Sequence, residues 1–284
     1  MRNIDKAKSS RRFYFSLRIL CTISLIISIV SLIGIILYIL INGVDKLSVQ
    51  LLFGKYGAEP SILPAFLGTF ELIIISTVIA VPIGIATAIF LVEYTNNKGR
   101  FVKVVQVATE TLAGIPSIVY GLFGYLIFVV ACKWGYSIMA GGLTLAIMIL
   151  PNIVRSTEES LLAVPDGLRE GAYALGTSKV RTIFKIVLPS ASSGIVTSII
   201  LAVGRVISES AVLILTIGMV VNKVPESLLS PGTSLALDIY YFASQGYPDE
   251  AAATSVVLLL LVLVINIAAS LVGKAFKKKT GDLQ

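Results

Sequence analysis

The chain has 284 residues, of which 56% are hydrophobic and only 14% charged, against about 25% charged in soluble domains. This composition indicates a membrane protein. The sequence contains no His, and its two cysteines, Cys21 and Cys132, lie in separate apolar stretches. The sequence therefore argues against imidazole acid–base chemistry, His-ligated metal sites and a disulfide scaffold. We expect no catalytic residues and no metal site.

Six apolar runs are long enough to cross a bilayer core, which takes about 20 helical residues. They cover residues 19–44, 72–92, 111–132, 134–154, 186–222 and 251–273. The first run is too long for the apolar part of a signal peptide, so we expect an uncleaved helix. The fifth carries only Arg205 and Glu209 as charges and exceeds one crossing; a tilted helix followed by an outer re-entrant segment would fill it. We predict an all-α membrane protein with six transmembrane helices.

The lysines and arginines orient these helices, because cationic flanks stay cytoplasmic. With the N-terminus inside, eighteen of the 23 Lys and Arg residues lie in inner segments. The outer segments contain Lys46, Lys55, Lys133 and Lys223, and Arg205 lies within the membrane. The net charge of +7 therefore gathers at membrane edges and does not indicate nucleic-acid binding. We predict a multi-pass plasma-membrane protein with cytoplasmic N- and C-termini.

The longest inner segment, residues 155–185, contains a short predicted helix. Asp166 is a plausible N-cap and Gly176 a plausible residue just beyond the C-terminal end. Leu168, Ala172 and Leu175 follow i, i+4, i+7 spacing and would form one small apolar face. Such a helix could insert into a groove of a partner; the alternative is an amphipathic turn lying on the lipid headgroups.

A sequence motif in this segment favours docking on a partner protein over lying on the lipid headgroups. Glu170-Gly171-Ala172, then Gly176, then residues 186–189 (IVLP) resemble the EAA motif of ABC importer permeases, E-A-A-x3-G-x9-I-x-L-P. The spacing matches, and Gly171 replaces the first Ala. In that family the motif forms the coupling helix, which docks on the ATPase. The resemblance implies that Glu170, Gly171, Ala172 and Gly176, with Leu168 and Leu175, make this contact. The sequence has no G-x-x-x-x-G-K-[ST] loop, so we expect no cofactor on this chain and ATP on the partner.

Arg205 and Glu209 are the second predicted site. At i and i+4 they would lie on one face of the fifth helix, about 6 Å apart. Ionisable groups at such depth cost about 3 kcal/mol or more and generally mark function. The guanidinium fork of Arg205 would bind an anion, since two parallel N–H donors match two phosphate oxygens, while Glu209 would orient it. The alternative is a neutralising intrahelical ion pair.

Several segments together resemble the PstA type of phosphate importer permease. They are ILPAFLGT (62–69), FLVEY (90–94), LAGIPSIVYGLFG (112–124), LPNIVRSTEE (150–159) and TSL (233–235). The chain departs from that family at Ser208 and Ser210, where Gly and Thr commonly flank the Glu. The resemblance implies that Arg155 is a second cation on the phosphate path; otherwise it is an anchor at the inner membrane face.

The resemblance implies the type I, MetI-like importer permease fold. Residues 1–60 would hold the N-terminal segment, first helix and outer loop, and residues 61–284 a five-helix core with the coupling loop 155–185. It further implies a permease subunit, without an ATPase site of its own, that imports phosphate with a homologous PstC-type permease, a PstB-type ATPase dimer and an external PstS-type binding protein. The rival interpretations are a permease for another oxyanion, such as sulfate, molybdate or phosphonate, and a stand-alone ion-coupled carrier or channel.

Overall fold

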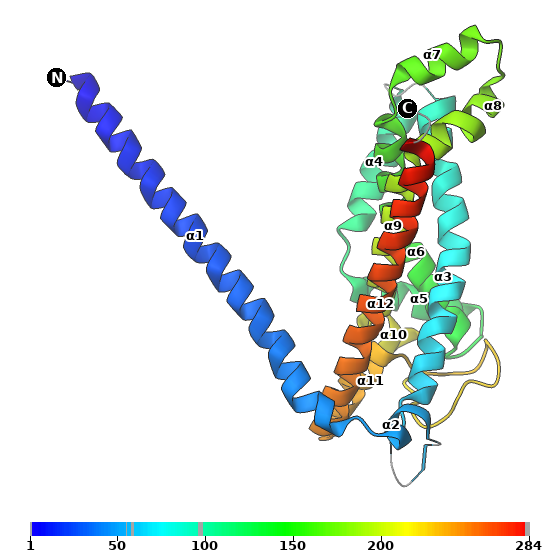
Figure 1. Cartoon of the computed structure of the whole chain (residues 1–284). Helices are drawn as coiled ribbons and strands as arrows, with labels where there is room; N and C mark the ends of the chain where they lie inside the picture. Colours follow the sequence, from blue (N-terminus) through cyan, green and yellow to red (C-terminus); the bar gives the residue numbers. More distant parts are fainter. Residues whose placement is uncertain (1, 55, 58–59, 96–98, 282–284) are drawn as a thin grey trace.

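The computed structural model describes residues 2–54, 56–57, 60–95 and 99–281 (Figure 1). Lys55 and Lys98, two of the cations used to orient the chain, lie outside the described residues. The described part is helical. In chain order the helices are α1 (Arg2–Gly43), η1 (Val44–Lys46), α2 (Val49–Phe53), α3 (Leu63–Ile89), η2 (Phe90–Tyr94), α4 (Arg100–Ala113), α5 (Ser117–Gly124), η3 (Tyr125–Ala131), α6 (Ile138–Leu162), α7 (Asp166–Ala174), α8 (Lys179–Thr182), η4 (Ile183–Val187), α9 (Leu188–Ile207), α10 (Ala211–Thr216), α11 (Leu235–Ser244) and α12 (Pro248–Gly281).

Within the described residues, five continuous helical stretches are long and apolar enough to cross a membrane, and a sixth forms if one bent pair counts as a span. The five are Tyr14–Lys46, Leu63–Tyr94, Ile138–Leu162, Lys179–Ile207 and Pro248–Leu271. The bent pair joins Arg100–Ala113 to Ser117–Ala131 at 99°. The third apolar run, residues 111–132, is therefore divided between the end of α4 and the helix that begins at Ser117. Pro116 explains the break, because it lacks an N–H and disfavours helical geometry at the residue before it.

The fifth apolar run is also divided. Helix α9 ends at Ile207, and α10 begins at Ala211 after three residues outside either helix. A loop over residues 217–234 follows and bonds back to the start of α6, where the Ile138 N–H donates to Ser230 and the Met139 N–H to Leu228. The expected division into a spanning helix and a further segment is thus present.

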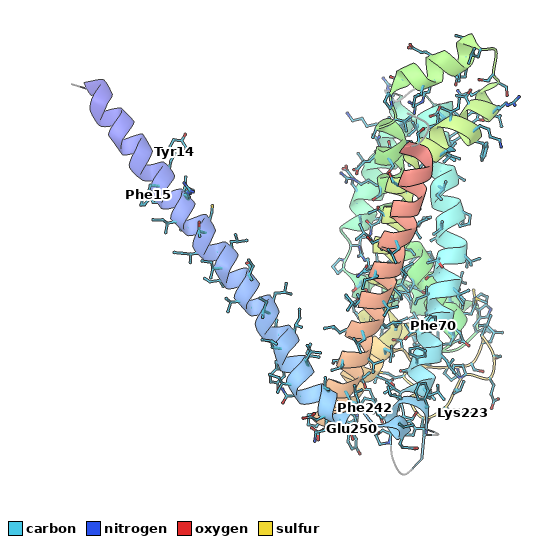
Figure 2. The ribbon with its side chains drawn as sticks, in the orientation of Figure 1. Tyr14, Phe15, Phe70, Lys223, Phe242 and Glu250 are labelled. Atoms are coloured by element: carbon cyan, nitrogen blue, oxygen red, sulfur yellow. The ribbon has the colours of Figure 1, made fainter. Side chains whose placement is uncertain are left out.

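Helix α1 projects away from the other helices (Figure 1). Side chains along it, including Tyr14 and Phe15, stand clear of the bundle (Figure 2). It meets the bundle at its C-terminal end, where Gly43 lies against Ala252 and Val256 of α12 so closely that an added Cβ would come 2.5 Å from a backbone oxygen. The division of the chain at residue 60 stays a prediction.

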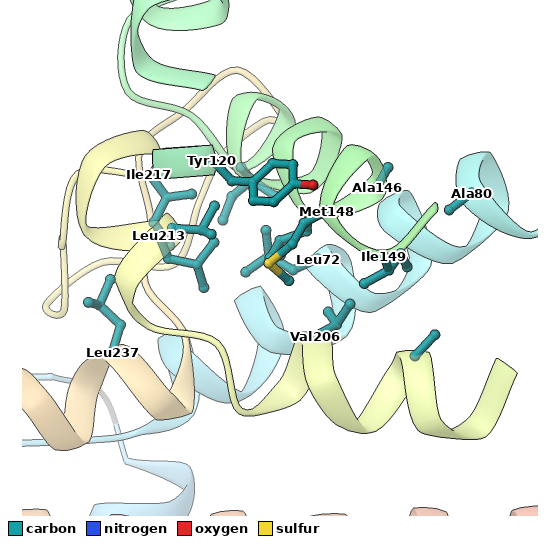
Figure 3. Close-up of a cluster of buried hydrophobic side chains, with 14 of the residues drawn as sticks. Leu72, Ala80, Tyr120, Ala146, Met148, Ile149, Val206, Leu213, Ile217 and Leu237 are labelled. Carbon is teal, nitrogen blue, oxygen red and sulfur yellow. The ribbon is translucent and has the colours of Figure 1, made fainter. Parts of the chain in front are cut away.

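The core surrounds α6, the most buried of the spans. Leu72 and Ala80 of α3, Met148 and Ile149 of α6 and Val206 of α9 belong to one buried cluster (Figure 3). Glycines let these helices approach: a Cβ on Gly84 of α3 would lie 2.6 Å from Ile153, and one on Gly142 of α6 would lie 2.6 Å from Ile75. Small residues at such contacts are typical of helix packing in membranes.

The chain ends and the predicted coupling segment share one end of the molecule. Helices α7 and α8 lie there together with the beginning of α1 and the end of α12, whereas α2 and α11 lie at the opposite end (Figure 1).

Candidate substrate path and coupling helix

Helix α7 is the predicted coupling helix, and its end is built as expected. Gly176 has φ +76°, the left-handed conformation that favours glycine after a helix. Its N–H donates to the Tyr173 carbonyl at 2.9 Å, and the Thr177 N–H donates to the Ala172 carbonyl at 3.2 Å. These two bonds form a Schellman motif, which confirms the predicted stop.

The predicted start of α7 is wrong by one residue. Pro165 occupies the N-cap position, and Asp166 lies in the first helical turn. Instead of capping the helix, the Asp166 carboxylate accepts a hydrogen bond from Arg169 Nη1 at 3.1 Å. Pro165 suits this position because its ring fixes φ near the observed −58°.

The expected single apolar face of α7 is divided between two surfaces. The relative exposure is 86% for Leu175, 41% for Leu168 and 4% for Ala172. Ala172 is buried because the segment after α7 folds back on it, with the Thr177 hydroxyl donating to its carbonyl at 2.7 Å. Glu170 and Gly171 are exposed. Leu168, Leu175 and Glu170 therefore face outward from the helix, whereas Ala172 faces the segment that follows α7.

Arg205 and Glu209 do not share a helix face, contrary to the sequence prediction. Helix α9 ends between them at Ile207, and no ion pair joins them in the described part of the chain. Glu209 Oε1 instead accepts from the Val212 N–H at 3.3 Å at the start of α10. Serines on both sides of Glu209, which compete for backbone hydrogen bonds, fit the break: the Ser208 hydroxyl donates to the Gly204 carbonyl at 2.6 Å.

Arg205 lies where two broken spans meet. Its side chain is half-buried on the last turn of α9, and the next residue, Val206, belongs to the same buried cluster as Tyr120 of α5. Tyr120 is buried and donates to the Leu112 carbonyl across the break between α4 and α5 at 2.8 Å. Non-helical backbone at membrane depth is tolerated where it is buried in protein or lines a water-filled cavity. No carboxylate of the described residues forms an ion pair with Arg205, so its guanidinium keeps donors for an anion.

Arg155 has a different environment. It lies on α6 and bonds Glu110 of α4 at 3.3 Å and Glu159 of α6 at 3.1 Å. All three side chains are more than half exposed. Two carboxylates around one guanidinium leave the cluster net negative, so in this conformation Arg155 is an ion-paired residue and not an isolated cation.

A groove of about 730 Å³ lies between the C-terminal half of α6 and the N-terminal half of α9. Glu159 lines it beside the Arg155 cluster, and Pro165 and Leu168 close it at the coupling segment. Its hydroxyl lining comes from Ser156, Ser160, Ser190, Ser192, Ser193, Thr197 and Ser198. The hydroxyls of Ser160, Ser192, Thr197 and Ser198 already donate to carbonyls of their own helices. The hydroxyls that the groove offers to a hydrated anion are therefore those of Ser156, Ser190 and Ser193.

Sequence reasoning missed one buried ion pair. Arg169 of α7 bonds Glu93 at the end of the α3 span through two nitrogens, at 3.1 and 3.0 Å. The sequence analysis counted Arg169 only as an inner cation and Glu93 only as part of the FLVEY segment. The two residues are 76 positions apart, so no local spacing connects them; the signal was an acidic residue ending an apolar run.

These features fit a membrane permease: a bundle of apolar helices with a broken span, an arginine without a carboxylate partner among the described residues, and a short exposed helix between two spans. The chain belongs to the family of binding-protein-dependent transport system inner membrane components, whose model matches residues 80–282. It is therefore a multi-pass membrane transport component.

Curated relatives match over most of the chain. A probable ABC transporter permease protein, YqgI of Bacillus subtilis, is 35% identical over 87% of this chain and 90% of the relative. The phosphate transport system permease protein PstA of Pasteurella multocida is 36% identical over 82% of this chain and 85% of its own length. The corresponding PstA of Mycobacterium leprae is 36% identical over 75% of this chain and 69% of its own length.

A solved structure confirms the fold class. An inward-facing form of the MetNI methionine ABC transporter superposes with a TM-score of 0.61 at 21% identity, covering 76% of this chain and 94% of that chain. The predicted all-α, MetI-like permease fold is therefore confirmed, with five continuous candidate spans among the described residues and a sixth if the bent pair is one span.

Proposed function

We propose that the chain is the permease subunit of an ATP-driven phosphate importer. Relatives described as phosphate transport permeases match it at 36% identity. The observation that carries the substrate assignment is Arg205, a half-buried guanidinium without a carboxylate partner among the described residues, on the last turn of α9 beside the break before α10. A guanidinium fork offers two parallel donors to two oxygens of a tetrahedral anion.

The proposed path runs from Arg205 along the α6–α9 groove to Arg155. Hydroxyls of the groove would replace water around the anion. Arg155 would receive the anion after Arg205 by exchanging one of its two carboxylates, Glu110 or Glu159, for phosphate. Glu209, which bonds the backbone at the start of α10, would hold the α9–α10 break in place next to Arg205.

Coupling to ATP would be mechanical. The exposed residues of α7, namely Leu168, Glu170 and Leu175 with Gly171 and Gly176, would dock on a PstB-type ATPase dimer, which hydrolyses the ATP. A homologous PstC-type permease would complete the path, and a PstS-type binding protein would deliver phosphate from outside. The alternating-access change would rock the spans attached to α7. Both chain termini would be cytoplasmic, on the α7 side of the plasma membrane.

The assignment is tested by reconstituting the complete importer and measuring ATP hydrolysis with binding protein loaded with phosphate, sulfate, molybdate or phosphonate in turn. We expect stimulation by the phosphate-loaded protein. A response to another oxyanion without a response to phosphate would instead support the rival permease. A stand-alone carrier would purify without an ATPase subunit, whereas we expect co-purification that weakens when Glu170 and Gly176 are replaced.

Arg205→Ala should abolish phosphate uptake while the complex still assembles, and Arg205→Lys should retain a small part of the uptake because it keeps the charge but not the fork. The measurement is phosphate uptake per amount of assembled complex. Uptake by Arg205→Ala near the parental rate would remove Arg205 from the path.

A further inference from the structure

The buried contact between α7 and the end of α3 uses the whole donor capacity of one arginine. The relative exposure of the side chain is 14% for Arg169 and 5% for Glu93. Nε and Nη2 of Arg169 both bond Glu93 Oε1, Nη2 also bonds the Leu161 carbonyl at 2.9 Å, and Nη1 bonds the Val164 carbonyl at 2.8 Å and the Asp166 carboxylate at 3.1 Å. A guanidinium has five N–H donors, and these five bonds employ all of them.

Three of the four acceptor residues belong to separate elements, and the fourth, Val164, lies in the connection between α6 and α7. Glu93 lies in η2, the π-helical end of the α3 span; Leu161 lies in the last turn of α6; Asp166 begins α7. The arginine therefore joins the coupling helix to both of the spans that meet at this end of the molecule. Helix η2 is itself held in place, because its Leu91 is buried in a cluster with Val102 of α4 and Val154 of α6.

A second cation reaches the residue next to Glu93. Lys179, which begins α8, lies over the ring of Tyr94 with its Nζ 4.9 Å from the ring centre, within the range of a cation–π contact. Helices α7 and α8 fold over the end of the bundle (Figure 1), and each places one cation on η2. The coupling segment is thus attached at both of its helices to the same five-residue stretch.

We propose that Arg169 is a positioning residue that transmits movement of α7 to α3 and α6. This inference rests on the proposed function, in which α7 is moved by an ATPase. A desolvated pair with a fully bonded arginine resists separation, because removing either partner leaves a buried charge uncompensated. The Arg169–Glu93 pair therefore makes α7, η2 and the end of α6 move as one body, so that displacement of a nine-residue helix reaches the spans instead of being absorbed by the connecting loop.

The coupling test measures phosphate uptake and ATP hydrolysis in the same proteoliposomes containing the complete importer. Arg169→Lys keeps the charge but has three donors instead of five, and Glu93→Gln keeps the size but not the charge. Arg181→Lys, the same change at an exposed position of the same segment, is the matched control. We expect ATP hydrolysis to persist in both variants and phosphate carried per ATP to fall about tenfold, with parental coupling in the control.

The two residues should act as a unit, so the double variant should lose no more coupling than the worse single variant. Parental coupling in Glu93→Gln, or losses that multiply in the double variant, would overturn the inference. Glu93→Gln decides the matter even if Arg169→Lys does not assemble, since it is the more conservative change in shape.

A distance measurement separates failure of this inference from failure of the phosphate assignment. Cys21 and Cys132 are exposed and would be replaced by Ser, and spin labels placed at Val78→Cys on α3 and Gly167→Cys on α7, both exposed positions. We expect one narrow distance distribution in the parental and Arg181→Lys complexes, and a broadened one in Arg169→Lys and Glu93→Gln. An unchanged distribution would overturn the inference. A parental complex that hydrolyses ATP but takes up no phosphate would refute the proposed substrate, and the label distances would still decide the role of Arg169.

Discussion

Replacing Gly124 by Ala should disturb the contact between the broken span and α6. A Cβ at this position would lie 2.0 Å from Thr144 Oγ1, 2.7 Å from its Cγ2 and 2.9 Å from its Cβ. Thr144 cannot turn away freely, because it is fully buried and its hydroxyl donates to the Ala140 carbonyl at 2.7 Å. Either α5 or α6 must therefore shift by a fraction of an ångström.

The expected cost follows from two opposing effects. Overpacking a tight core contact costs about 1–3 kcal/mol, whereas Ala in place of Gly in a helix recovers about 0.5–1 kcal/mol. We expect a net destabilisation of about 1–2 kcal/mol, which lowers the apparent Tm by about 3–5 °C. Trp134, which stacks on Phe128 at the end of the broken span, provides the fluorescence signal for thermal unfolding in detergent.

Two comparisons make the prediction specific. In Gly124→Ala combined with Thr144→Ala, Oγ1 and Cγ2 are absent, so the apparent Tm should come within about 2 °C of Thr144→Ala alone. Gly34→Ala on α1, where nothing lies within 4 Å of the added Cβ, should raise the Tm slightly, because it gains the helix preference of Ala without a clash. If Gly124→Ala unfolds at the temperature of Gly34→Ala, or if the Thr144 change does not rescue it, the packing argument is wrong.

Three further changes test other parts of the structure. Gly171→Ala, with no atom within 4 Å of the new Cβ, should stabilise α7 by about 0.5–1 kcal/mol and slow its amide exchange; faster exchange would contradict this. Gly176→Ala forces a side chain into φ +76° and should cost about 1 kcal/mol, seen as faster α7 exchange and weaker ATPase co-purification. Burial raises the pKa of Asp238, in α11 outside the candidate spans, to about 7, although the Thr233 hydroxyl bonded to it lowers the pKa. Because the folded pKa exceeds the unfolded one, stability is greatest at low pH and falls by roughly 4 kcal/mol between about pH 4 and 7; Asp238→Asn should flatten this slope in thermal unfolding.

The sequence predicted the fold where apolar length decides it. A run of about 20 apolar residues is stable in a bilayer as a helix, so the membrane spans could be predicted. The fifth run is longer than one crossing, so its division into two segments could be predicted as well. The 99° break between α4 and α5 was not, because Pro116 is compatible with either a kinked or a divided helix. Contacts between residues on the two sides of the break decide between a kinked and a divided helix, such as the hydrogen bond from the Tyr120 hydroxyl to the Leu112 carbonyl.

The candidate site was predicted in part. The stop of α7 at Gly176 was predictable because a positive φ selects glycine locally. The geometry of Arg205 and Glu209 was not, since i, i+4 spacing implies a shared face only if the helix continues, and α9 ends at Ile207. The Arg169–Glu93 pair depends on packing between distant segments, which spacing along the chain does not encode.

The most direct test of the account compares uptake by three sets of proteoliposomes: the complete importer, the same complex without its ATPase subunit, and the complete importer carrying Glu93→Gln. All would hold binding protein and phosphate on one side and ATP on the other. The account predicts phosphate accumulation in the first set, none in the second, and ATP hydrolysis with about a tenth of the uptake in the third. Accumulation by vesicles that lack the ATPase would contradict it.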